Sequence, residues 1–330
     1  MYFSIIIPTY NPKIFLPRML ESITHNDCAS DIEVIISDDC SDEDFTDVVN
    51  QYSDKLNIVC TKNKEHYGAP LMGRQNGADV ATGKWICFAD QDDYWLANAF
   101  DLVKEKIEED NCKNYLVTDF YIEHLDGNTE EIIQAGNWTH GKFYEKKFWD
   151  EYEVSYPENI RYCEDIALSV NVNCILYDNN LERFYYPCFT YAWIEREDSL
   201  SKANGLADDS YFFKSIPEYT KGTLGQYIAK MRKDDYYLIS IIDMYFHFYF
   251  YFQGLMCTGT EIPDSYYDLL AQYLDKFLAE FEISLDGFKQ LVKDSCVYQY
   301  NMTRSVCCKQ VPFIEQQLFD DFMDDINLRR

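Results

Sequence analysis

Short apolar runs alternate with segments of helical periodicity through the first half of the chain. The runs have the length of buried strands, and between them apolar residues recur on one helical face. The runs are Ser4–Pro8, Ile32–Ser37, Leu56–Thr61 and Trp85–Ala89. Strands that alternate with helices in this way predict an α/β fold with a mostly parallel sheet flanked by helices.

Local signals predict where several elements begin and end. We expect the first helix to begin at Pro12, with Asn11 as its cap, because proline fits the first helical turn. Gly83 is expected to cap the helix that precedes Trp85–Ala89. Asp126–Asn128 predicts a hairpin turn. Further elements are expected as a short helix within His140–Tyr152, a helix over Ile166–Leu176 and a strand over Phe184–Ile194.

The sequence pattern changes near Gly205, where long segments of helical periodicity that are rich in tyrosine replace the alternation of strands and helices. We therefore predict two domains, residues 1–205 and a smaller α-helical domain over residues 206–330. Tyr236–Cys257 is apolar and long enough to raise the question of a membrane span. Asp243 and His247 lie in its middle, where a charge costs about 2.5–3.5 kcal/mol. A buried helix fits better, and no transmembrane span is expected.

Charge and cysteine content limit the partners and the compartment. The net charge of −28 argues against a nucleic-acid partner, because phosphate binding rests on clustered lysine and arginine. It also disfavours direct binding to anionic lipid. The 12 cysteines form no C-x-x-C pair, and the strand-like run begins at Phe3 with no targeting peptide. A cytoplasmic location is expected, with peripheral attachment to the inner face of a membrane through a partner as an alternative.

Two of the apolar runs end in acidic residues. Trp85–Ala89 is followed by Asp90-Gln91-Asp92-Asp93, and Ile32–Ser37 is followed by Asp38-Asp39. Open α/β sheets bind ligands at the carboxyl ends of their strands. Crowded carboxylates repel one another, and a divalent cation such as Mn²⁺ or Mg²⁺ removes that repulsion. The alternative is a solvated acidic turn that caps the next helix. The chain has no glycine-rich dinucleotide fingerprint and no P-loop.

Four segments, in this order, resemble the family 2 glycosyltransferases of the GT-A fold. They are SIIIPTYNP (Ser4–Pro12), VIISDDCSDED (Val34–Asp44), GRQNGADVATGKWICFADQDDYW (Gly73–Trp95) and YCEDIAL (Tyr162–Leu168). The stretch His140–Asp165 is similar to bacterial members that build capsule or exopolysaccharide. The resemblance covers roughly residues 1–205. It implies a Rossmann-like GT-A sheet for this part of the chain.

The resemblance also implies a donor-binding site. Pro8, Thr9 and Tyr10 match residues that line the base pocket, and the Tyr10 ring is suited to stacking. Asp39 matches the acid that accepts a hydrogen bond from uracil N3–H, which implies a UDP-sugar; its alternative role is a helix N-cap. Arg74 matches an arginine near the diphosphate or the uracil, and a surface helix arginine is an equal alternative.

The same resemblance assigns roles in the D-x-D motif. Asp90 faces the ribose, Asp92 binds the metal that bridges the diphosphate, and Gln91 between them belongs to the donor site. Asp93 has the alternative role of capping the next helix. Arg196 stands where many members carry a metal-binding histidine. Either the metal has fewer protein ligands, or Arg196 stabilises the diphosphate directly.

Asp165 is the expected catalytic base, since it matches the acid of the family's E-D motif. A carboxylate within reach of the acceptor hydroxyl can remove its proton as the hydroxyl attacks the sugar. Glu164 is expected to orient the acceptor or to tune Asp165. The alternative reading is that both acids only favour the dipole at a helix N-terminus.

These observations predict an inverting, metal-dependent glycosyltransferase that moves a sugar from a UDP-sugar to a hydroxyl group. The expected acceptor is a surface glycan: capsule, exopolysaccharide, lipid-linked oligosaccharide or glycoprotein. One alternative is a degenerate GT-A-like scaffold. Another is a sugar nucleotidyltransferase, although Pro8–Pro12 lacks the glycine-rich loop that such enzymes need. The C-terminal helices are expected to bind the acceptor or to form a homo-oligomer.

Overall fold

A computed structural model describes residues 1–135, 138–156, 164–197, scattered positions between 264 and 279, 282–290 and 316–330. The chain divides into two compact units, Met1–Ser199 and Leu200–Arg330. The predicted boundary near residue 205 and the apolar stretch Tyr236–Cys257 lie outside the described residues, so both stay predictions. Among the helices that the structure describes, none has the length and apolarity needed to cross a membrane.

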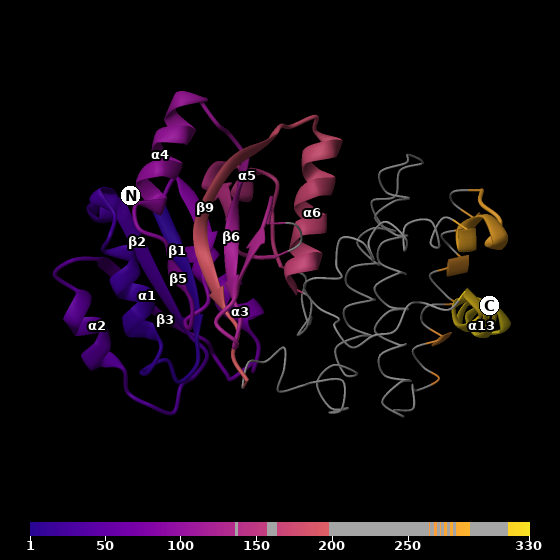
Figure 1. Cartoon of the computed structure of the whole chain (residues 1–330), viewed down its shortest axis with the longest axis horizontal. Coiled ribbons are helices and arrows are strands. Elements are labelled where there is room, and N and C mark those ends of the chain that lie inside the picture. The colour runs from indigo at the N-terminus through magenta and orange to yellow at the C-terminus, as the bar shows by residue number, and fades with distance from the viewer. Residues whose placement is uncertain are drawn as a thin grey trace. The chain divides into compact units, whose positions relative to one another are not determined.

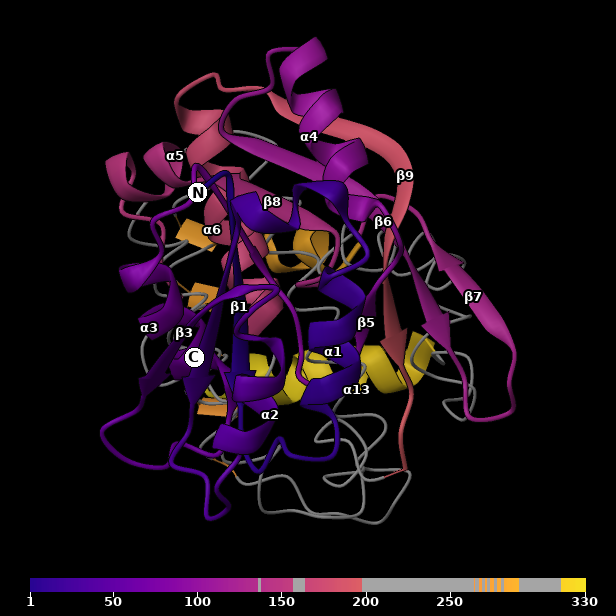
Figure 2. The same ribbon diagram turned by 90° about the vertical axis from the view of Figure 1, so that its left-hand side faces the viewer.

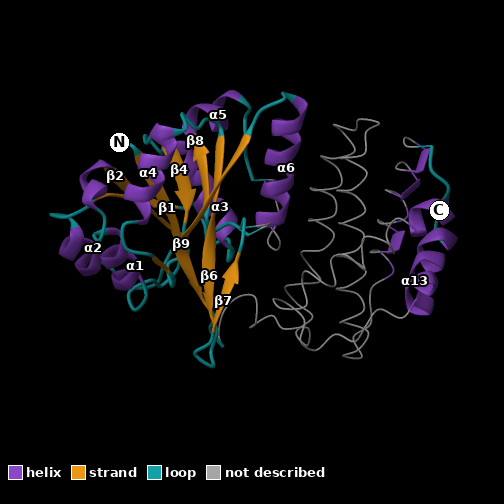
Figure 3. Ribbon diagram, turned by 45° about the horizontal axis from the view of Figure 1, so that its top comes forward, coloured by secondary structure: helices purple, strands orange, loops and turns teal. Residues whose placement is uncertain are grey.

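In the described part of residues 1–197, nine strands form one sheet in the order β3-β2-β1-β4-β8-β6-β9-β5, with β7 paired to β6 (Figure 3). The strands are β1 (Phe3–Thr9), β2 (Ile32–Asp38), β3 (Asn57–Lys62), β4 (Trp85–Phe88), β5 (Tyr94–Trp95), β6 (Tyr115–Glu123), β7 (Thr129–Ile132), β8 (Lys142–Glu145) and β9 (Arg183–Ile194). Strands β3, β2, β1 and β4 are parallel. Strand β8 is antiparallel to β4 and β6, β9 is parallel to β6, and β5 is antiparallel to β9.

Helices cover both faces of this sheet. They are α1 (Leu16–Ile23), α2 (Thr46–Tyr52), α3 (Pro70–Val80), α4 (Ala99–Glu109), α5 (Lys146–Glu151) and α6 (Glu164–Asp178), and a 3₁₀ turn spans Asp27–Asp31. Helices α1 and α2 lie on one side of the strands and α6 on the other, as Figures 1 and 2 show. The predicted α/β fold is confirmed for this unit, but the sheet is mixed rather than mostly parallel: its β3-β2-β1-β4 part is parallel, whereas β8, β7 and β5 form antiparallel pairs.

The core explains why the apolar runs are continuous rather than alternating. Every residue of β1, β2 and β4 is buried, because helices cover both faces of these parallel strands. On the predicted inner face of α4, Phe100, Val103 and Ile107 are all buried. The ring of Phe100 contacts those of Phe3 and Trp95, with centroids 5.1 and 4.6 Å away.

The first helix begins later than expected. Helix α1 starts at Leu16, not at Pro12, and Pro17 stands in its first turn. Asn11 adopts a left-handed conformation with φ of 46°, and its Oδ1 accepts a hydrogen bond from the Asp42 amide at 2.9 Å. This link ties Asn11 to the loop after β2, so the chain cannot enter a helix at Pro12.

Gly83 lies against strand β1 and does not cap a helix. Helix α3 ends at Val80, and Ala81 after it is extended, so the predicted cap at Gly83 is wrong. A Cβ on Gly83 would lie 2.6 Å from the backbone of Phe3 and Ser4 in β1. The hairpin prediction, by contrast, is confirmed: β6 and β7 are antiparallel, and Gly127 has a φ of 83°.

The described residues of the second unit include one long helix, α13 (Gln316–Leu328). Its residues Phe322, Met323 and Ile326 are buried, so one face of α13 packs inward. Arg329 at its end pairs with Asp264 and Asp268, at 2.6 and 2.9 Å. These residues agree with the predicted helical character of this region.

Replacing Gly83 by alanine should destabilise the first unit. The added methyl group would collide with backbone atoms of β1, and overpacking of this kind costs about 1–3 kcal/mol. Urea unfolding should show this loss, whereas Val80→Ala at the exposed end of α3 should change stability by less than about 0.5 kcal/mol. Equal effects of the two substitutions would contradict the close approach of Gly83 to β1.

Candidate active site

The acidic ends of β2 and β4 flank the end of β1, because these three strands are neighbours and parallel. The side chain of Gln91, which follows β4, holds the loop after β1 in place. The Gln91 Oε1 accepts a hydrogen bond from the Tyr10 amide at 2.9 Å, and its Nε2 donates to the Tyr10 carbonyl at 3.0 Å. The predicted donor residues Tyr10 and Gln91 therefore lie together, with Gln91 acting on the backbone of this loop.

Asp39 is buried and fixed by the loop that precedes α3. Its carboxylate accepts hydrogen bonds from Asn63 Nδ2 at 2.7 Å and from the amides of Tyr67 and Gly68, at 3.0 and 2.8 Å. The N-cap alternative for Asp39 is wrong, because α2 begins at Thr46. The carboxylate instead stabilises the loop beside the carboxyl ends of β1, β2 and β4. We call this end of the sheet, where the donor is expected to bind, the crevice.

His66 joins Asp39 to Tyr10. Its Nδ1 lies 3.0 Å from Asp39 Oδ2, and its ring faces the Tyr10 ring with centroids 4.4 Å apart. Sequence reasoning missed His66, because a loop histidine without periodic neighbours carries no signal. Pro8 and Thr9 are buried behind this pair, while Tyr10 is exposed. Among the residues predicted to line the base pocket, Pro8, Thr9 and Tyr10, it is therefore Tyr10 whose ring is exposed and could contact a base.

Arg74 lies in α3 and is buried, with only 3% of its surface exposed. Its Nη2 donates to Asp90 Oδ1 and its Nη1 to Glu164 Oε1, both at 2.6 Å. The alternative of a surface arginine is therefore wrong. Arg74 connects the D-x-D motif after β4 to the E-D motif at the start of α6, which lie 74 residues apart in the chain.

The charges around Arg74 shift the pKa values of its partners. Burial alone would raise the pKa of Asp90, but the charges of Arg74 and His140 outweigh it and the pKa is lowered. Burial raises the pKa of Glu164 to about 7, and Arg74 opposes that rise. Asp90 is therefore held ionised, whereas Glu164 titrates near neutral pH.

Asp92 pairs with Arg196, whose Nη1 lies 2.6 Å from Asp92 Oδ2. Arg18 donates a hydrogen bond to the Asp92 carbonyl. Burial raises the pKa of Asp92, and the charge of Asp90 adds to the rise. This excess of negative charge and the hard oxygen donors fit a divalent cation such as Mn²⁺ or Mg²⁺.

Asp93 does not cap α4, whose N-cap is Asn98. It is buried, and its two oxygens accept hydrogen bonds from Tyr191 Oη at 2.7 Å and from the Ile194 amide at 2.9 Å. Asp90, Asp93 and His140 also bring ligand atoms within 4.8 Å of one another. Because both Asp93 oxygens are already used by β9, we assign Asp93 to the structure rather than to a metal.

Asp165 lies in the first turn of α6, beside Glu164. Lys142 from β8 is buried next to this turn: its Nζ donates to Ser169 Oγ at 2.6 Å, and Ser169 Oγ donates to the Asp165 carbonyl at 2.8 Å. Burial lowers the pKa of Lys142 to about 7, against the opposing charge of Asp165. Sequence reasoning missed Lys142, although a lone lysine before Phe143 and Tyr144 offered a weak signal.

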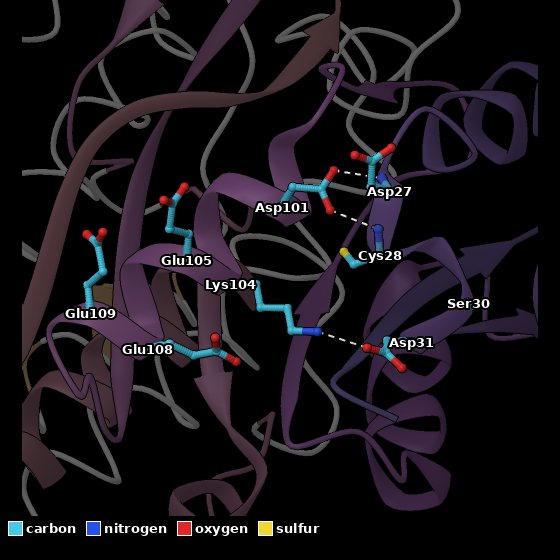
Figure 4. Close-up of a pocket in the computed structure, with 9 residues that line it drawn as sticks. All are labelled: Asp27, Cys28, Ser30, Asp31, Asp101, Lys104, Glu105, Glu108 and Glu109. Carbon is cyan, nitrogen blue, oxygen red and sulfur yellow. Dashed lines mark hydrogen bonds and ion pairs between the residues drawn. The ribbon is translucent and has the colours of Figure 1, made fainter.

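A groove of about 630 Å³ lies on another part of this unit (Figure 4). Its lining comes from the 3₁₀ turn before β2 and from α4, and includes Asp101, Glu105 and Glu108. Lys104, the basic residue of the lining, pairs with Asp31 at 2.8 Å. This groove is at the amino end of β2, and its acids would repel a diphosphate, so it does not fit a nucleotide-sugar.

Arg74→Met should destabilise the fold by about 2–4 kcal/mol at pH 8, because it leaves two partly buried carboxylates without their cation. The deficit should shrink as the pH falls toward 5. Without Arg74 the folded pKa of Glu164 rises above about 7, so the folded state takes up a proton before the unfolded chain does. Urea unfolding across this pH range measures both effects.

A suitable control is Lys104→Met, which breaks a surface ion pair and should cost less than about 1 kcal/mol at every pH. A deficit in Arg74→Met that stays constant between pH 8 and pH 5 would contradict the burial of these charges.

Lys142→Met tests the buried amine. In the wild type the folded pKa is about 7 and the ordinary value is 10.5, so the unfolded chain binds more protons between these values. Wild-type stability should therefore rise with pH in this window, and the variant should lack that slope. Unfolding at pH 6.5, 8 and 9.5 should show the variant's relative stability greatest at pH 6.5 and declining thereafter. Lys147→Met, at an exposed position of α5, should keep the wild-type slope.

Known proteins resemble this chain in sequence and in fold. The family model "Glycosyl transferase family 2" matches residues 4–160. A Campylobacter jejuni protein, GalNAc(5)-diNAcBac-PP-undecaprenol beta-1,3-glucosyltransferase, is 30% identical over 49% of this chain and 55% of its own length. The Escherichia coli protein WfaP, a UDP-Glc:alpha-D-GlcNAc-diphosphoundecaprenol beta-1,3-glucosyltransferase, is 34% identical over 59% of this chain and 66% of its own. The chain thus spans little more than half the length of the first of these relatives.

Solved structures show the same fold. Residues 1–349 of Staphylococcus aureus TarS, in complex with UDP-GlcNAc, superpose with a TM-score of 0.70 at 16% identity, over 99% of this chain and 91% of that one. An identity this low supports the fold alone. The family match, the curated relatives and the fold together identify residues 4–160 as a glycosyl transferase family 2 domain with a GT-A fold.

Proposed function

We propose that this protein is an inverting, metal-dependent glycosyltransferase that moves a sugar from a UDP-sugar to a hydroxyl group of a surface-glycan acceptor. The observation that carries the proposal is the double ion pair of Arg74. Because one guanidinium holds both Asp90 and Glu164, the donor-binding motif and the motif of the catalytic base belong to one site. A degenerate scaffold would have no reason to keep this buried pair of carboxylates.

The donor nucleotide would lie at the ends of β1 and β2. The exposed ring of Tyr10 supplies a stacking surface, and the Asp39 carboxylate behind it is the acceptor for uracil N3–H. Asp90, kept ionised by Arg74, is suited to accept hydrogen bonds from ribose hydroxyls. A UDP-sugar is also supported by WfaP, whose name includes UDP-Glc, and by TarS, which was solved with UDP-GlcNAc.

Asp92 would hold the divalent cation, Mn²⁺ or Mg²⁺, through its carboxylate. When bound, this cation supplies positive charge beside the diphosphate of the leaving UDP. The chain's own cation there is Arg196, which we assign to the diphosphate as a second positive group. Gln91 contributes by fixing the loop of Tyr10 against this turn.

Asp165 would act as the catalytic base. Its carboxylate takes the proton of the acceptor hydroxyl as the oxygen attacks the anomeric carbon, and the bond to UDP breaks on the opposite side. One displacement of this kind inverts the anomeric centre. Base catalysis contributes about 10²–10⁴-fold, or roughly 3–5 kcal/mol. Glu164, held by Arg74 and titrating near pH 7, is placed to orient the acceptor.

A lipid-linked oligosaccharide fits best among the possible acceptors. Both curated relatives described above carry an undecaprenol-linked acceptor in their names. Such a substrate would bring a cytoplasmic enzyme to the inner face of the membrane, where a partner or the second unit could hold it. We assign acceptor binding or self-association to residues 206–330 within that second unit.

Asp165→Asn should reduce transfer about 10²–10⁴-fold while UDP still binds, since the amide cannot take the proton but keeps the shape of the side chain. Release of UDP from a panel of UDP-sugars with Mn²⁺ measures turnover without a known acceptor, and calorimetry measures UDP binding. Asp150→Asn, an exposed acid paired with Lys146, is the matched control and should retain full turnover. Unchanged turnover in Asp165→Asn would remove Asp165 from its role, and a wild type with no turnover on any donor would favour a scaffold.

A further inference from the structure

The carboxylate assigned to the metal is already paired with a cation of the chain itself. Arg196 follows β9, and its Nη1 lies 2.6 Å from Asp92 Oδ2. Both side chains are partly exposed, at 19% for Arg196 and 24% for Asp92. The pair is therefore a charge-assisted hydrogen bond at the wall of the crevice rather than an inaccessible core contact.

A second contact holds Arg196 in this position. The centre of its guanidinium lies 3.9 Å from the centroid of the Phe15 ring, at the start of α1. A guanidinium stacked on an aromatic face keeps its planar donors directed to one side. Phe15 thus provides a platform on which Arg196 can pair with a carboxylate or, after a small change of direction, with phosphate oxygens.

A divalent cation and Arg196 compete for the same oxygen. A metal at about 2.0–2.2 Å from a carboxylate oxygen cannot coexist with a guanidinium nitrogen at hydrogen-bond distance along the same lone pair. The two cations would also repel each other. Metal binding at Asp92 Oδ2 therefore requires Arg196 to move to another anion, and the diphosphate of the donor is the one that the proposed site offers.

We propose that Arg196 exchanges partners: it pairs with Asp92 in the free protein and with the diphosphate of a bound nucleotide, so that Asp92 accepts a divalent cation only together with the nucleotide. This inference rests on the proposed function for the assignment of Asp92. It adds an order of binding, in which the nucleoside diphosphate creates the metal site. It also explains how a half-buried acid beside Asp90 is kept neutralised when the crevice holds no ligand.

Mn²⁺ binding to the full chain, followed by electron paramagnetic resonance, tests the exchange without any enzyme activity. In the absence of nucleotide, Arg196→Met should bind Mn²⁺ about tenfold more tightly than the wild type, because Asp92 has lost its competitor. Adding UDP should strengthen Mn²⁺ binding strongly in the wild type and much less in the variant. Asp92→Asn combined with Arg196→Met should abolish the gain, which identifies Asp92 as the ligand.

Arg18→Met is the matched control. Arg18 carries the same charge and reaches the same residue, but it donates to the Asp92 carbonyl and not to the carboxylate. If Arg196 weakens Mn²⁺ binding because it occupies the Asp92 carboxylate, the loss of Arg18 should change Mn²⁺ affinity by less than about threefold. An equal gain in both variants would overturn the proposal in favour of a net-charge effect.

Two further outcomes separate this inference from the proposed function. If the wild type binds Mn²⁺ with UDP but Arg196→Met shows no gain without it, the partner exchange is wrong and the metal-dependent enzyme stands. If neither protein binds Mn²⁺ with UDP, both the exchange and the metal requirement fail. Thermal unfolding of each variant confirms that the compared proteins are folded.

Discussion

The buried guanidinium of Arg74 is the interaction on which the site depends. A charge in the core is tolerated only when it is paired, and Arg74 is paired twice, with Asp90 and Glu164. Each partner comes from a different element, so the pairing fixes α3, the turn after β4 and the start of α6 relative to one another. The relative position of both motifs thus depends on one residue.

Asp39, Asp92 and Asp93 are paired with groups of different kinds, and the kind of partner indicates the role of each acid. Asp39 is held by backbone amides, an asparagine and His66, and Asp93 by a tyrosine hydroxyl and an amide; all of these partners lie within the fold. Asp92, by contrast, has an ionic partner that is partly exposed, Arg196. A partner within the fold fixes the orientation of its carboxylate, whereas a partly exposed ionic partner can be replaced by a ligand.

Much of the fold could be predicted from the sequence because it depends on local patterns. The apolar runs of β1, β2 and β4 and the buried face of α4 reflect the burial of single elements. The late start of α1 could not be predicted, because it depends on Asn11 binding the loop after β2. The burial of Arg74 could not be predicted either, because its partners lie 16 and 90 residues away and no local pattern reports contacts at such separations.

The position of Asp165 shows why a structural role and a catalytic role need not exclude each other. A helix N-terminus favours a carboxylate through its dipole, and α6 begins with two. If that were their only purpose, nothing would require Glu164 to be buried against Arg74, or the amine of Lys142 to be buried beside the same turn. Burying charged groups opposes folding unless they are paired, so a helix cap alone would favour exposed acids. The dipole explains why acids are tolerated at this turn, and the contacts with Arg74 and Lys142 explain why the turn is held against α3 and β8.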